Sequence, residues 1–142
     1  MAAHGRVLVI PQQSDFYNEH IRPADNRVFV IISDAMRYDV AASLADELRR
    51  ETQSNVKLGS MQSIFPSITK FGMAALLPHK TLTAELKNEV LNVLADGQST
   101  ASTNRDKVLK GVNPASVALQ YKNIIGMKRA ERAALVKGMD VV

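Results

Sequence analysis

The sequence contains no cysteine, few aromatic residues and no long apolar run. The lack of cysteine excludes thiolate metal sites and thiol nucleophiles, and it gives no sign of an oxidising compartment. The apolar runs are far shorter than the roughly 20 residues of a membrane span, and the first residues lack the long apolar region of a signal peptide. We therefore expect a cytoplasmic protein that does not enter a membrane.

Aromatic side chains make up only 5% of the sequence, so no stacking platform for nucleic-acid bases is evident. The formal net charge of +4 is compatible with an anionic partner, but the positive side chains are scattered. In the second half they favour a solvated face over a nucleic-acid groove: Lys107, Lys110, Lys122, Lys128, Arg129, Arg132 and Lys137. Nucleic-acid binding is kept only as an alternative function.

What is present is enough for a folded domain. A chain of 142 residues with 46% hydrophobic content fits one domain with a buried core. We expect residues 14–142 to form it, and residues 1–13 to be an N-terminal segment of undetermined nature. In that segment, the apolar run from Arg6 to Ile10 is either an edge strand or the remnant of an upstream region, and Pro11 stops it.

The stretch from Arg27 to Asp39 organises the rest of the chain. Val28 to Ile32 are five consecutive apolar residues, which is typical of a central, parallel strand covered on both faces. After Ser33 and Asp34, apolar residues recur at helical spacing between residues 40 and 48. Ligands of open α/β sheets bind outside the carboxyl ends of strands, so Asp34 is the first candidate for chemistry.

The other segments continue an alternation of helices and strands. We expect a helix over residues 15–21 with Ser14 as N-cap, a strand over 55–62, and a helix that starts near Ser67 or Thr69 and stops at Pro78. Further along we expect a strand over 89–95 ending in the Asp96-Gly97 turn, a helix over 104–109 ended by Gly111, a strand over 117–121, and a helix over 124–137 capped by Gly138. Val141 and Val142 read as the start of another strand, so we expect that the strand is cut there.

Two of these stretches, Val28-Phe29-Val30-Ile31-Ile32-Ser33-Asp34-Ala35-Met36-Arg37-Tyr38 and the later run from Phe65 to Pro78, resemble the start of a PglZ domain. This domain is a branch of the alkaline phosphatase superfamily found in bacterial phage-defence systems of the BREX and Pgl type. Shorter matches at 96–100, 104–105 and 121–142 extend the resemblance over roughly residues 14–142. It implies the N-terminal part of an α/β three-layer sandwich with a mostly parallel sheet.

The resemblance also implies roles for particular residues. In the superfamily, the aspartate that ends the first strand binds one of two divalent metals, usually zinc, and a threonine or serine at the next helix N-terminus is the nucleophile. These roles fall on Asp34 and Thr69, with Ser67 as the alternative nucleophile or a substrate-binding residue. Arg37 either contacts the substrate phosphate or has a structural role, in which it pairs with Asp39 or with a helix end, and we favour the structural role. A metal lowers the pKa of a hydroxyl, and a helix N-terminus suits a phosphate.

The metal site requires more ligands than this sequence offers. The histidines His4, His20 and His79 form no His-x-His or His-Glu-x-x-His pattern. We therefore expect part of a metal-dependent phosphoesterase that acts on an unidentified phosphorylated substrate, binds no metal itself and is inactive alone. The alternative is a non-catalytic scaffold in a defence complex with other proteins. Because the sheet would be left open, we also expect a homo-oligomer.

The assignment of Asp34 and Thr69 makes a geometric demand. The strand end after Ile32 and the helix start after Pro66 must lie side by side, with both side chains facing solvent. A bridging metal limits the two oxygens to a separation of roughly 4 Å, and a relaxed loop could open it to about 8 Å. Two unrelated capping residues would not be held together in this way.

Overall fold

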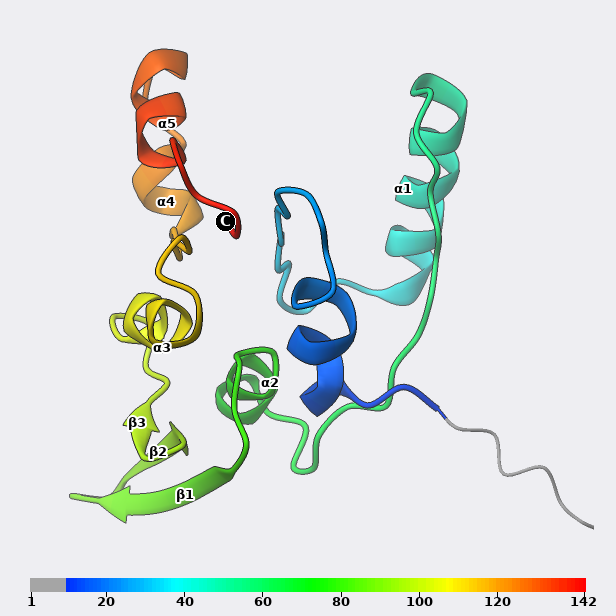
Figure 1. Ribbon diagram of the computed structural model, residues 1–142. Coiled ribbons are helices and arrows are strands. Elements are labelled where there is room, and N and C mark those ends of the chain that lie inside the picture. The colour runs from blue at the N-terminus through cyan, green and yellow to red at the C-terminus, as the bar shows by residue number, and fades with distance from the viewer. Residues whose placement is uncertain (1–9) are drawn as a thin grey trace, which may run out of the picture.

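The computed structural model describes residues 10–142, so the expected strand from Arg6 to Ile10 lies outside the described residues except for Ile10. Of the regular elements in the described residues, helices are more extensive than strands, and long segments without regular structure connect them (Figure 1). Its helices are η1 (Gln13–Asp15), η2 (Tyr17–Ile21), α1 (Tyr38–Glu51), α2 (Thr69–Ala75), α3 (Arg105–Val112), α4 (Tyr121–Ile124) and α5 (Arg129–Leu135). Its strands are β1 (Leu82–Lys87), β2 (Val90–Ala95) and β3 (Gln98–Ser99).

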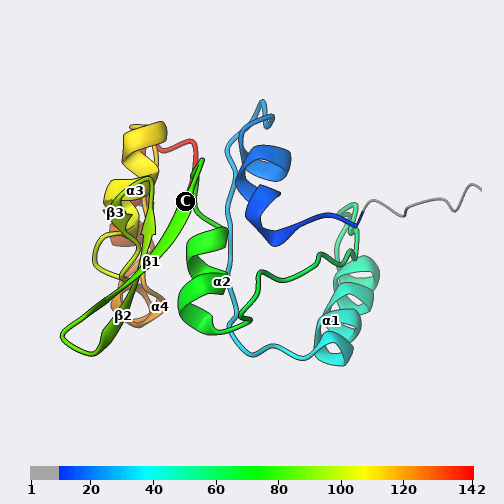
Figure 2. The same cartoon turned by 90° about the horizontal axis from the view of Figure 1, so that it is seen from below.

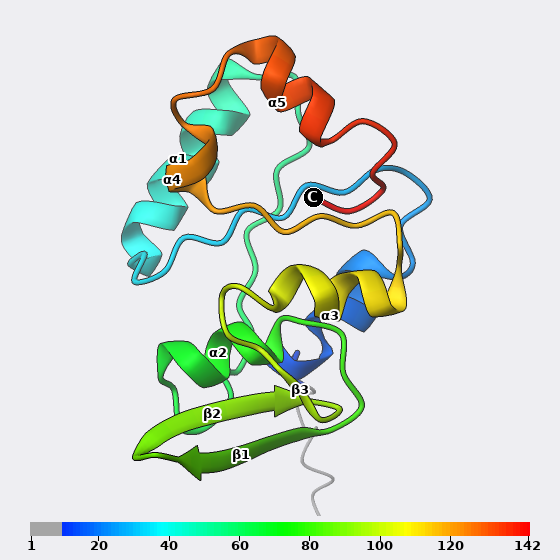
Figure 3. The ribbon, with the colours of Figure 1, turned by 90° about the vertical axis from the view of Figure 1, so that its left-hand side faces the viewer.

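The three strands form one antiparallel sheet in the order β1-β2-β3. Strand β2 confirms the strand expected at residues 89–95. Asp96 and Gly97 form the turn that joins β2 to β3, and both have positive φ angles, of 47° and 81°. Two-residue turns of this kind match the twist of the strands that they connect, which is why an Asp-Gly pair marks a hairpin in the sequence. In Figure 3 the hairpin closes one end of the molecule, below α2 and α3.

The mostly parallel sheet and the three-layer sandwich expected from the sequence are not what the structure shows. Val28 forms only an isolated parallel bridge to Val141, and Val141 forms a second one to Ser116. Val28 and Val30 exchange backbone hydrogen bonds with residues 140 and 142 at 2.8–3.0 Å. The strand directions are therefore those that the sequence predicted, but the ladder is too short to form a sheet.

The parallel pairing of segment 28–32 ends at Val30, where the chain becomes exposed to solvent. Beyond Val30 the segment has no pairing, and Ile31 is 92% exposed. Phe29, on the same face as Ile31, is 58% exposed, so this face of the apolar run is open. Val28 and Val30, on the other face, pack against the cluster around Val141. The composition of this run favours burial on both faces, but the run pairs with only one neighbouring segment. Without further hydrogen-bonding partners its backbone does not form a regular strand.

Several other expectations also need correction. The strand expected at 55–62 is extended chain whose only described bridge joins Gln62 to Gln12. The helix expected at 124–137 is shorter: α4 already ends at Ile124, and α5 spans only Arg129–Leu135. Lys128 marks its start by donating its N–H to the Glu131 carboxylate at 2.7 Å. The strand expected at 117–121 is not formed: the nearest bridge is at Ser116, and Tyr121 is the first residue of α4. Ser14 lies within η1 and Gly111 within α3, so neither is the expected cap.

Two small clusters hold the described part of the chain together. Tyr17, Ile21 and Val141 form one, and Leu77, Ala95 and Val108 form the other. The half-buried Leu109 of α3 packs against both clusters, so it links the hairpin end to the parallel segments. Within residues 10–142, no helix is long and apolar enough to cross a membrane.

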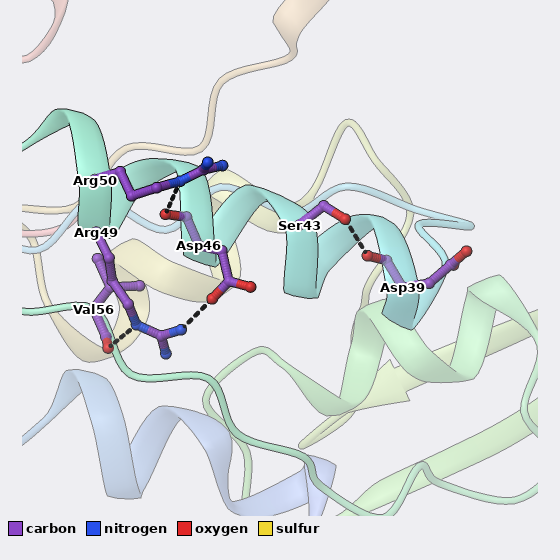
Figure 4. A network of polar contacts seen from close by, with 6 residues as sticks. All are labelled: Asp39, Ser43, Asp46, Arg49, Arg50 and Val56. Carbon is purple, nitrogen blue, oxygen red and sulfur yellow. Dashed lines mark hydrogen bonds and ion pairs between the residues drawn. The ribbon is translucent and has the colours of Figure 1, made fainter.

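Helix α1 lies apart from both clusters, beside the extended segment that follows it (Figures 1 and 2). Arg49 joins the two, since its Nη1 donates to Asp46 Oδ1 at 2.7 Å and its Nε to the Val56 carbonyl at 3.3 Å (Figure 4). Ala45, one helical turn before Arg49, is buried at 6% exposure. The apolar residues expected on the helix, at 40–48, all lie within α1.

Candidate functional site

The Asp34 carboxylate and the Thr69 hydroxyl meet although 35 residues separate them. Thr69 Oγ1 donates a hydrogen bond to Asp34 Oδ2 at 3.2 Å, and both residues are exposed. Figure 2 shows the segment that carries Asp34 passing along α2 before it turns towards α1. The separation lies within the roughly 4 Å that a shared metal would require. The geometric demand is therefore met, while the chemical roles of the two residues stay predictions.

Local backbone geometry presents each side chain. Asp34 begins a tight turn in which Ala35 has a positive φ of 58°, and the Ala35 N–H donates to Asp34 Oδ1 at 3.0 Å. Thr69 is the first residue of α2, after Ile68 in an extended conformation. No side chain caps this helix. The Thr69 hydroxyl is thus used for the contact with Asp34 rather than for the capping role that a threonine often plays.

Side chains that the sequence analysis did not single out hold α2 in place. Gln13 donates from Nε2 to the Gly72 carbonyl at 3.3 Å and accepts from the Ile64 N–H at 3.1 Å. Lys70 donates from Nζ to the Leu91 carbonyl at 2.8 Å, which ties the start of α2 to β2. A glutamine and a lysine carry no motif, and their partners lie 21 to 59 residues away, so no sequence signal could have found them.

The other two site candidates lie nearby along the chain. Arg37 pairs with Asp39 through two hydrogen bonds, from Nε at 3.0 Å and from Nη2 at 2.8 Å, and both side chains are exposed. The pairing with Asp39, part of the structural role favoured from the sequence, is therefore present, and a contact of Arg37 with substrate stays a prediction. Ser67 is exposed and lies two residues before α2. The hydroxyl that reaches Asp34 is that of Thr69.

The donor set fits part of a divalent metal site. Asp34 and Thr69 offer two oxygen ligands on one exposed surface, whereas zinc sites use about four ligands. In residues 10–142, no three His, Cys, Asp or Glu side chains are grouped so that they could hold a metal. His20 lies against the Phe16 ring at 5.3 Å, and His79 Nδ1 lies 2.7 Å from the Leu77 carbonyl. Asp34 and Thr69 therefore could hold one side of a metal but not enclose it.

Comparison with known families places the chain. The family description that matches residues 16–142 is the BREX system PglZ alkaline phosphatase-like domain. The chain therefore belongs to this PglZ family, as the two stretches around Asp34 and Thr69 indicated.

Two relatives fit the same class. The chain is 40% identical over 139 residues to the alkaline phosphatase-like protein BrxZ of Escherichia coli, a match that covers 94% of this chain and 16% of the relative. It is 36% identical over 135 residues to the alkaline phosphatase-like protein PglZ of Bacillus cereus, covering 93% and 16%. The chain thus spans less than a fifth of the length of these relatives. No solved structure matches it.

Proposed function

We propose that this chain is part of a metal-dependent phosphoesterase domain of a BREX-type phage-defence system, with Asp34 as a metal ligand and Thr69 as the nucleophile. The observation that carries the proposal is the 3.2 Å contact between the Thr69 hydroxyl and the Asp34 carboxylate. Membership of an alkaline phosphatase-like family supports it, because such chemistry needs an oxygen nucleophile beside an anionic metal ligand.

Asp34 would orient Thr69 for attack on a phosphorylated substrate. Asp34 Oδ2 accepts the hydroxyl hydrogen and so orients Thr69 Oγ1, and Ala35 fixes the other carboxylate oxygen. A divalent metal, expected to be zinc, would when bound be held by these two residues and lower the pKa of the hydroxyl. The exposed Oγ1 would form the bond to phosphorus and lose its proton to solvent, while the bond from phosphorus to the leaving oxygen breaks and its electron pair stays on that oxygen. Helix α2 has only seven residues, so its dipole would contribute little.

Asp34 and Thr69 alone would not catalyse phosphoryl transfer, because the metal needs further protein ligands. Two oxygen ligands leave a metal mostly hydrated, and they do not fix an in-line geometry for phosphoryl transfer. In the complete domain, other segments would supply the remaining ligands. The alternative, a scaffold without catalysis, makes the same prediction for turnover by this chain but not for metal binding at Asp34.

A metal titration tests the assignment. We expect calorimetry to give a zinc dissociation constant no tighter than micromolar, and we expect no turnover of p-nitrophenyl phosphate, because the ligand set is incomplete. In NMR spectra, Mn²⁺ should broaden the amide signals around Asp34 and Thr69 before any others. Asp34→Asn should abolish this selective broadening, whereas the control Asp25→Asn in an exposed turn should keep it.

Two outcomes would contradict the proposal: the first concerns the incomplete ligand set, and the second concerns the role of Asp34. Nanomolar zinc binding or metal-dependent turnover would show that the account of an incomplete ligand set is wrong. Broadening centred elsewhere, or broadening that survives Asp34→Asn, would remove Asp34 from the metal site and leave the scaffold function.

A further inference from the structure

An apolar groove with several cationic lining residues includes neither Asp34 nor Thr69. Its volume is about 1010 Å³, and most of its lining is apolar. The lining residues come from η2, segment 29–32, α2, α3, segment 117–121, α4, α5 and residues 141–142. Its four charged lining residues are Arg105, Lys122, Arg129 and Arg132. Among the residues that the structure describes, no acidic side chain lines it. The groove is therefore suited to an apolar segment that carries negative charge.

Helix α1 presents a surface of that kind. Val40, Leu44 and Leu48 form a stripe at four-residue spacing and remain 51%, 44% and 40% exposed. Glu47 follows Leu44 by three residues and Glu51 follows Leu48 by three, so both acidic residues lie along this stripe. The covered side of α1, with Ala45 and Arg49, faces the segment after the helix. Leu44 and Leu48 lie about 100° around the helix from Ala45 and Arg49, so the stripe is not the side that makes this contact.

The chain's own α1 is poorly placed to fill its own groove. In Figures 1 and 2, η2, α2 and the segment that follows η2 lie between α1 on one side and α3, α4 and α5 on the other. A second molecule has no such constraint, since its α1 can approach from solvent.

We infer that the groove binds the α1 stripe of a second copy of this chain. Val40, Leu44 and Leu48 enter the apolar floor, and Glu47 and Glu51 meet the cationic side chains of α5. Reciprocal docking of two α1 helices into two grooves closes a twofold dimer, because each molecule offers both surfaces. This interaction does not depend on the proposed phosphoesterase chemistry.

Charge reversal tests the interface without removing buried groups. Light scattering should show a dimer of the wild-type chain at tens of micromolar. The variant Glu47→Lys with Glu51→Lys should raise the dimer dissociation constant at least about tenfold, because it places like charges against the cationic lining residues. Arg129→Glu with Arg132→Glu should do the same from the other side. The matched control, Glu19→Lys with Glu85→Lys, changes two exposed acidic residues outside the stripe and should leave the dimer intact.

Mixing the two reversed variants is the decisive step. Each should be monomeric alone, yet an equimolar mixture should form heterodimers, since one interface is wild-type and the other has both charges exchanged. Circular dichroism of each variant checks that it is folded. A monomeric wild-type chain, or a mixture that stays monomeric while both variants are folded, would overturn the inference.

Engineered cysteines identify which helix occupies the groove. The chain has no cysteine of its own, so Leu44→Cys and Ala133→Cys can be introduced without competing thiols. A mixture of the two single variants should form a disulfide-linked dimer on mild oxidation. An intramolecular disulfide in the double variant, under conditions where the protein is monomeric, would show that a chain's own α1 fills the groove and would also overturn the inference.

Discussion

Asp96 shows how much one side chain can organise at the residue scale. Its Oδ1 accepts from the Thr81 N–H at 2.8 Å and from Thr81 Oγ1 at 3.1 Å, and its carboxylate lies 3.0 Å from the Lys80 N–H. The backbone N–H groups of Thr81 and then Lys80 lower the pKa of the Asp96 carboxyl, because they bond its charged form. The residue thus fixes the start of β1 against the turn between β2 and β3.

This contact predicts a pH dependence of stability. Because the pKa of Asp96 is lower in the folded than in the unfolded chain, its stabilising effect is present above the unfolded pKa and is lost as pH falls through the folded pKa. Asp96→Asn should therefore be less stable than wild type at pH 7, and the difference should shrink below about pH 4. Urea unfolding midpoints across this range measure it.

Thr81→Val provides the matched comparison, because it removes one of the donors and keeps the carboxylate. Its pH-dependent loss should be smaller than that of Asp96→Asn. A wild-type minus Asp96→Asn difference that stays constant from neutral to acidic pH would contradict this account of Asp96.

At the scale of elements, two glycines should respond in opposite ways to the same substitution. Gly97, in the turn between β2 and β3, has a φ of 81°, which an alanine adopts only with strain. Gly111 lies within α3, and a Cβ there would meet nothing within 4 Å. We expect Gly97→Ala to lower the free energy of unfolding by about 1 kcal/mol, and Gly111→Ala to raise it by about 0.5–1 kcal/mol.

Thermal and urea unfolding of the two variants would compare them directly. The pair serves as its own control, since each adds one methyl group to an exposed site. Equal effects of the two substitutions would mean that backbone conformation does not decide their cost.

At the scale of the whole molecule, Val141 joins three parts of the chain. It bridges Val28 on one side and Ser116 on the other, and its side chain packs with Tyr17 and Ile21. Val141→Ala should lower the free energy of unfolding by about 1–2.5 kcal/mol, because it removes buried methyl groups from a small cluster.

The exposed Val112 is the control for this substitution. Val112→Ala should change the free energy of unfolding by less than about 0.5 kcal/mol, because its side chain is already in contact with water. Urea titration of both variants gives the comparison. Similar losses for the two positions would show that the segments around Val141 contribute little to stability.

The sequence by itself determined the features that rest on local chemistry. The apolar spacing of α1 and the Asp-Gly turn after β2 follow from preferences of short segments. Gly138 has a left-handed φ of 74°, but it is not the expected cap, because α5 ends at Leu135 with Val136 as its C-cap. The resemblance to the family added the pairing of Asp34 with Thr69, which spacing alone could not indicate.

Only the tertiary structure decided which segments find neighbours. The apolar run from Val28 to Ile32 indicates that its residues favour burial. It does not indicate whether other strands or helices pack against it, and Ile31 is 92% exposed. The ties from Gln13 and Lys70 to α2, the antiparallel sheet and the cationic groove likewise join residues far apart in sequence. Such contacts depend on the tertiary packing of distant segments, and no local pattern of residues indicates which segments will pack together.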